Sequence, residues 1–79
     1  MKKLLLVKDD GAIAELERDY LEADGFMVDI SSDGDEGMRL ALTGDYSLIL
    51  LDVMLPGADG FAICRTVRKE RDIPILMVS

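Results

Sequence analysis

Two short runs of apolar side chains, each followed at once by charged residues, constrain the fold more than any other feature of the sequence. The runs are Leu4–Val7, followed by Lys8-Asp9-Asp10, and Leu48–Leu51, followed by Asp52. Short, wholly apolar runs are typical of strands that are buried on both faces of a parallel sheet. They are far shorter than a membrane-spanning segment, so we expect no membrane partner.

The segments between the strands have the spacing of amphipathic helices. The first helix is expected to bury a face made of Ile13, Leu16, Tyr20 and Leu21, the second a narrow stripe of Met38, Ala41 and Leu42, and the third Phe61, Ile63, Cys64 and Val67. We expect Asp10 and Asp59 to cap the first and third helices at their amino ends. Gly25 is expected to end the first helix in the left-handed conformation.

Strands are expected to begin near residues 4, 26, 48 and 75, the second from the alternation of Phe26, Val28 and Ile30. The resulting order, β-α-β-α-β-α-β, predicts an α/β fold with a parallel sheet and right-handed crossovers. A length of 79 residues allows one small domain, and we interpret residues 1–79 as that domain.

Composition excludes several classes of function. The chain has no histidine and a single cysteine, Cys64, so it can form neither a Ser-His-Asp nor a Cys-His catalytic site, nor an internal disulfide. A net charge of −7 repels nucleic-acid phosphates, so we expect no direct nucleic-acid contact. A reducing, cytoplasmic location fits this cysteine usage.

Polar residues follow three of the predicted strands. These are Lys8, Asp9 and Asp10 after the first, Asp52 after the third, and Ser79 after the fourth. Ligands of open α/β sheets bind beyond the carboxyl ends of the strands, so we expect these side chains to meet at one edge. Clustered carboxylates are ligands that suit Mg²⁺, and a carboxylate beside a bound cation can attack phosphorus.

Each of these residues also has a plainer interpretation. Asp10 is the expected helix cap, and the basic residues in 65–71 are either a solvated helix end or a docking patch for an acidic partner. Asp52 differs because it follows four apolar residues directly. A carboxylate at the mouth of a buried strand indicates a function.

The segments Leu5–Asp10, Leu48–Gly60 and Pro74–Ser79 together resemble the response-regulator receiver domain of two-component signalling, in the branch that carries a winged-helix output domain. The resemblance implies a flavodoxin-like (CheY-like) fold with strand order 2-1-3-4-5, and a regulatory domain rather than an enzyme. It implies that Asp52 is the phosphoacceptor for a sensor histidine kinase. It also implies that Asp9 and the backbone carbonyl of Met54 join Asp52 in binding Mg²⁺, and that Ser79 is the switch hydroxyl.

Two departures from the family pattern stand out. Lys8 occupies a position where the family has an acid, and its ammonium group is expected either to reach Asp52 or to swing into solvent. The family also continues past the fourth strand with a helix, a fifth strand and a last helix, so we interpret this chain as a truncated, incomplete receiver domain. We expect the bare sheet face or the edge of the fourth strand to promote self-association into a dimer or larger homo-oligomer.

The leading hypothesis is therefore a Mg²⁺-dependent phosphoacceptor that is impaired by Lys8 and by truncation. The alternative is a non-catalytic interaction module, a pseudo-receiver or self-assembling fragment. A phosphohydrolase with an aspartate nucleophile is disfavoured, because such enzymes usually place a second acid where this chain has Met54. A flavin- or nucleotide-binding flavodoxin relative is disfavoured because no glycine-rich loop follows the first strand.

Overall fold

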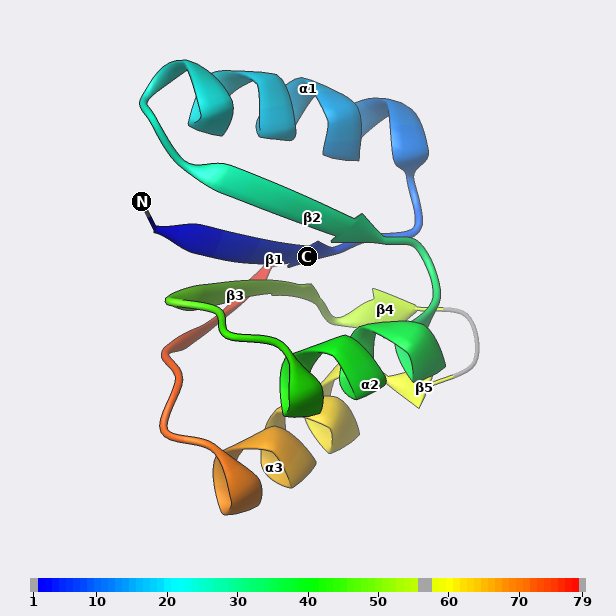
Figure 1. The fold of residues 1–79 in the computed structure, drawn as a ribbon. Helices are drawn as coiled ribbons and strands as arrows, with labels where there is room; N and C mark the ends of the chain where they lie inside the picture. Colours follow the sequence, from blue (N-terminus) through cyan, green and yellow to red (C-terminus); the bar gives the residue numbers. More distant parts are fainter. Residues whose placement is uncertain (1, 56–57, 79) are drawn as a thin grey trace.

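Four parallel strands form the centre of the fold, with helices on both of its faces (Figure 1). The computed structural model describes residues 2–55 and 58–78. The strands are β1 (Lys3–Val7), β2 (Met27–Ser31), β3 (Leu48–Asp52) and β6 (Ile75–Val78), in the order β2-β1-β3-β6. The predicted α/β class, parallel sheet and strand order are confirmed, and each strand starts within one residue of its expected position.

The first and third of the three helices begin at the caps that the sequence predicts. The helices are α1 (Gly11–Ala23) on one face of the sheet, and α2 (Gly34–Thr43) and α3 (Gly60–Glu70) on the other (Figure 1). The Asp10 carboxylate accepts the Ile13 N–H at 3.2 Å, and the Asp59 carboxylate accepts the Phe61 N–H at 2.9 Å. Gly25 has a φ of 95°, so the predicted left-handed end of α1 is also confirmed.

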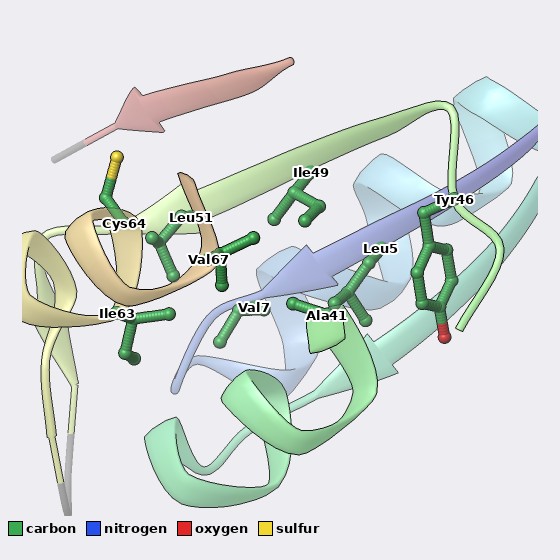
Figure 2. Packing of buried hydrophobic residues seen from close by; sticks show 9 residues of the cluster. All are labelled: Leu5, Val7, Ala41, Tyr46, Ile49, Leu51, Ile63, Cys64 and Val67. Carbon is green, nitrogen blue, oxygen red and sulfur yellow. The ribbon is translucent and has the colours of Figure 1, made fainter. Parts of the chain in front are cut away.

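The larger core lies between the sheet and helices α2 and α3 (Figure 2). Its buried members are Leu5, Val7, Ala41, Tyr46, Ile49, Leu51, Ile63, Cys64 and Val67. Since side chains alternate along a strand, the residues between these point toward α1, where Leu4 and Leu6 pack in a second cluster with Ala14 and Val28. The same alternation determines which face of the sheet carries the side chains at the carboxyl ends of β1 and β3.

The predicted buried faces of α1 and α3 are partly wrong. Ile13, Leu16 and Tyr20 are 46%, 58% and 73% exposed, and Phe61 is 52% exposed. Helix α1 instead approaches the sheet through Ala14, the residue it buries fully, with Leu21 packed beside it. No second helix of the described chain lies on this face, so the apolar stripe of α1 stays uncovered (Figure 1).

A short hairpin that the sequence does not predict follows β3. The sequence indicates only a break at Leu55-Pro56-Gly57, but β4 (Met54–Leu55) pairs antiparallel with β5 (Ala58–Asp59); Pro56 and Gly57 lie outside the described residues. The chain then returns to the end of β3, where the Gly60 N–H donates to the carbonyl of Val53, the residue after β3, at 3.1 Å. A side-chain carbon at Gly60 would collide with the Asp52 carbonyl oxygen.

Polar contacts also join β1, β2 and the segment that precedes β3. The Tyr46 hydroxyl donates to Asp29 Oδ2 at 2.7 Å, and Lys3 Nζ lies 3.4 Å from the same oxygen. Burial, and then the bond to Asp29, raises the pKa of Tyr46 to about 12. Arg71 donates to the Leu42 carbonyl at 2.8 Å, so at least one residue of the basic segment 65–71 ties α3 to α2.

Candidate functional site

Asp52 lies at the carboxyl end of a central strand, as predicted. It is the last residue of β3 and is half-buried, and it pairs in the sheet register with Val78 of β6. The Val53 N–H donates to the Val78 carbonyl at 2.9 Å, which fixes the chain just beyond Asp52. Ser79, the expected switch hydroxyl, lies outside the described residues.

The other two aspartates of the expected cluster are exposed. Asp10 is occupied as the cap of α1, which is the plainer of its two interpretations. Asp9 stands between the end of β1 and this cap, at the same edge of the sheet as Asp52. The carboxyl edge therefore presents one half-buried carboxylate, Asp52, and one exposed carboxylate, Asp9, that is not engaged in capping α1.

Lys8 does not swing into solvent, and in this respect the expectation is wrong. Its side chain is only 17% exposed, and its Nζ lies 3.5 Å from Oε1 of Glu17 on α1. The cause is the alternation along β1: Leu4 and Leu6 point toward α1, so Lys8 does too. The apolar pattern of the sequence does not single out Glu17, although this acid lies three residues after the buried Ala14, on the same side of α1.

The strand register also places Lys8 beside Asp52. Val7 pairs with Leu51 across β1 and β3, and continuing this register by one residue sets Lys8, just beyond β1, next to Asp52 at the end of β3. Leu48 and Leu50 pack on the α1 side of the sheet, and by alternation Asp52 points to that side as well. An ammonium group and a carboxylate thus share one face at the carboxyl edge.

These donors fit a divalent cation only weakly. The expected ligands are the carboxylates of Asp9 and Asp52 with the backbone carbonyl of Met54. Among residues 2–55 and 58–78, no three or more His, Cys, Asp or Glu side chains are grouped as a metal site would require. The Lys8 ammonium adds positive charge to the face that carries Asp52, which opposes cation binding.

The sequence matches a family whose known members share this architecture. A family model for the response regulator receiver domain matches residues 4–79. The chain belongs to this family. It is the receiver domain of a two-component response regulator, and receiver domains are regulatory phosphoacceptors that pair with histidine kinases and generally bind Mg²⁺.

Relatives and solved structures agree with this assignment. The transcriptional regulatory protein ResD of Bacillus subtilis is 42% identical over 77 residues, covering 98% of this receiver domain and 32% of ResD. A CheY-like receiver domain from Methanospirillum hungatei superimposes with a TM-score of 0.93 at 29% identity, covering 98% of this chain and 62% of the other.

A third similar protein, TrrA of Thermotoga maritima, has been solved in complex with Mg²⁺–BeF and, separately, with the histidine kinase ThkA. The TM-scores are 0.92 and 0.90 at 32% identity, with 98% of this receiver domain covered and 68% and 67% of the TrrA chains. The receiver domain described here thus spans about a third of the length of the curated relatives it matches.

None of the helices in the described part of the chain combines the length and the apolar character needed to cross a membrane.

Proposed function

We propose that Asp52 accepts a phosphoryl group from a phosphohistidine on a sensor histidine kinase. The observation that carries the proposal is a half-buried carboxylate at the carboxyl end of a central strand in a receiver domain. One Asp52 oxygen forms a bond to phosphorus as the nitrogen–phosphorus bond of the phosphohistidine breaks. The released imidazole nitrogen keeps the bonding electron pair and takes a proton from solvent, and Asp52 becomes an acyl phosphate.

We further propose that this reaction is slow, because Lys8 replaces an acid at the edge. When bound, Mg²⁺ supplies positive charge that stabilises phosphoryl oxygens. Here Asp9, Asp52 and the Met54 carbonyl would hold it, against the repulsion of the sheltered Lys8 ammonium. Weak binding of Mg²⁺ follows from this charge balance.

The test is phosphoryl uptake from acetyl phosphate in the presence of Mg²⁺, followed quickly by intact mass. We expect a slow, Mg²⁺-dependent mass gain of one phosphoryl group, which base removes. Asp52→Asn should abolish the gain, whereas Asp45→Asn, at an exposed aspartate far from the carboxyl edge, should retain it. Equal uptake by Asp52→Asn would refute the phosphoacceptor assignment, and uptake as fast as that of TrrA would refute the impairment.

The partners follow from the relatives. TrrA forms a complex with a histidine kinase, and ResD is a transcriptional regulatory protein, so we propose a kinase as the phosphoryl donor and a role in regulating transcription. The net charge of −7 favours a domain that does not itself touch nucleic acid. A cytoplasmic location suits these partners.

One observation favours a second function, self-association as a non-catalytic interaction module. In the described sheet β6 is an edge strand, and its Leu76 is 54% exposed. Exposed apolar strand edges pair readily with further chains.

Sedimentation velocity over a range of concentrations tests this second function. We expect the wild-type protein to associate and Leu76→Lys to shift it toward monomer. Phe61→Lys is the matched control, because Phe61 is similarly exposed, at 52%, but lies at the start of α3. A wild-type protein that stays monomeric at every concentration would exclude self-association.

A further inference from the structure

We propose that Glu17 is a positioning residue for the Asp52 site: Glu17 and Asp52 compete for the Lys8 ammonium group, and Glu17 sets how far it stands from Asp52. This inference deepens the proposed function and rests on it for its biological meaning. Its test, however, uses the unphosphorylated protein.

The first support is the contact itself. The Lys8 side chain is 17% exposed and the Glu17 side chain is 39% exposed, so water screens the attraction between their charges only in part. The atom Oε1 of Glu17 is buried, and no hydrogen bond reaches it from the described residues. Lys8 Nζ, 3.5 Å away, is therefore the positive charge that balances this buried oxygen.

The length of the contact matters as much as its partners. Charge-assisted hydrogen bonds between nitrogen and oxygen are usually about 2.7–2.9 Å long. At 3.5 Å, the Lys8–Glu17 pair is held by charge without a good hydrogen bond. Because the Lys8–Glu17 pair has no good hydrogen bond to lose, the ammonium group can move to a second nearby carboxylate at little energetic cost.

Asp52 is such a carboxylate. Register and alternation place it next to Lys8, on the same face of the sheet. Lysine is a flexible side chain with a compact charge, so its ammonium can turn from α1 to β3 by rotating side-chain bonds. Removing Glu17 should therefore let the Lys8 ammonium turn toward Asp52, whereas removing Asp52 should leave it at Glu17.

Nuclear magnetic resonance of the unphosphorylated protein can follow this competition through nuclear Overhauser contacts of the Lys8 Hε protons. In the wild-type protein we expect contacts to the Glu17 Hγ protons. In Glu17→Gln we expect these contacts to be lost, stronger contacts to the Asp52 Hβ protons, and a shifted Lys8 Nζ resonance. Glu15→Gln is the matched control, since Glu15 lies on the same helix, is 67% exposed and pairs with Arg18 at 3.9 Å; Lys8 should not respond to it.

Two outcomes would overturn the proposal: a wild-type Lys8 without contacts to Glu17, or a Glu17→Gln variant in which the contacts to Asp52 do not change. If Glu17→Gln fails to fold, Glu17→Asp keeps the charge but draws it back by one methylene, and a partial shift toward Asp52 is then expected. Failure to take up a phosphoryl group would refute the proposed function. It would not change the contacts of Lys8 with Glu17 and Asp52 in the unphosphorylated protein. The two proposals therefore fail separately.

Discussion

Replacing Gly60 with alanine should strongly destabilise the domain. The new carbon would collide with the carbonyl oxygen of Asp52 and lie 2.9 Å from both Cα and O of Val53. These are backbone atoms that cannot swing aside, and the Gly60 N–H bond to Val53 would be strained as well. Overpacking of this kind costs about 1–3 kcal/mol or more, out of a total of roughly 4–12 kcal/mol for a domain of this length.

Urea denaturation followed by circular dichroism measures this loss, and Gly11→Ala is the matched control. Gly11 also opens a helix, but a side-chain carbon there has nothing within 4 Å. We expect Gly11→Ala to be neutral or to raise stability by about 0.4–1 kcal/mol. If Gly60→Ala unfolds at the same urea concentration as Gly11→Ala, the backbone at Gly60 does not lie as close to the Asp52 carbonyl as described.

The second large effect concerns Lys8→Asp, which should raise the affinity for Mg²⁺ at least about tenfold, equivalent to roughly 1.4 kcal/mol. The change exchanges a positive for a negative charge on the face that carries Asp52. In the absence of metal the new carboxylate would face the buried oxygen of Glu17, which loses its cation. Lys8→Asp should therefore be less stable than wild type without Mg²⁺ and should gain stability as Mg²⁺ is added.

Calorimetric titration with Mg²⁺ and thermal unfolding with and without the metal provide the measurements. Lys2→Asp makes the same change of charge at the opposite end of β1, on an exposed residue, and should leave the affinity unaltered. The double variant Lys8→Asp with Glu17→Gln should recover stability in metal-free solution. A Lys8→Asp protein that binds Mg²⁺ no better than Lys2→Asp would contradict the charge argument.

The strands could be predicted because their signal is strong and local. Leu4–Val7 and Leu48–Leu51 are apolar on both faces, and both become central strands of the sheet. The hairpin of β4 and β5 carries no such signal, since each of its strands has only two residues and no periodicity can develop. Its form depends on the close approach of Gly60 to Asp52 and Val53 at the end of β3, which the local sequence does not encode.

The position of a site residue could be predicted from the sequence only where that residue directly follows the apolar run of a strand. Asp52 ends β3 as expected, whereas Glu17 was missed because apolar spacing assigned the buried face of α1 to Ile13, Leu16 and Tyr20. The helix instead approaches through Ala14. The metal ligands, the role of Ser79 and self-association stay predictions.

The single fully buried residue of α1 has a consequence for motion. A helix that is anchored mainly by Ala14, while the larger core lies across the sheet, can undock as one cooperative unit at a free energy well below that of global unfolding. Each such opening would carry Glu17 away from the sheet and leave the Lys8 ammonium group at the end of β1, beside Asp52. We therefore expect the charge around Asp52 to be an average over docked and undocked conformations of α1.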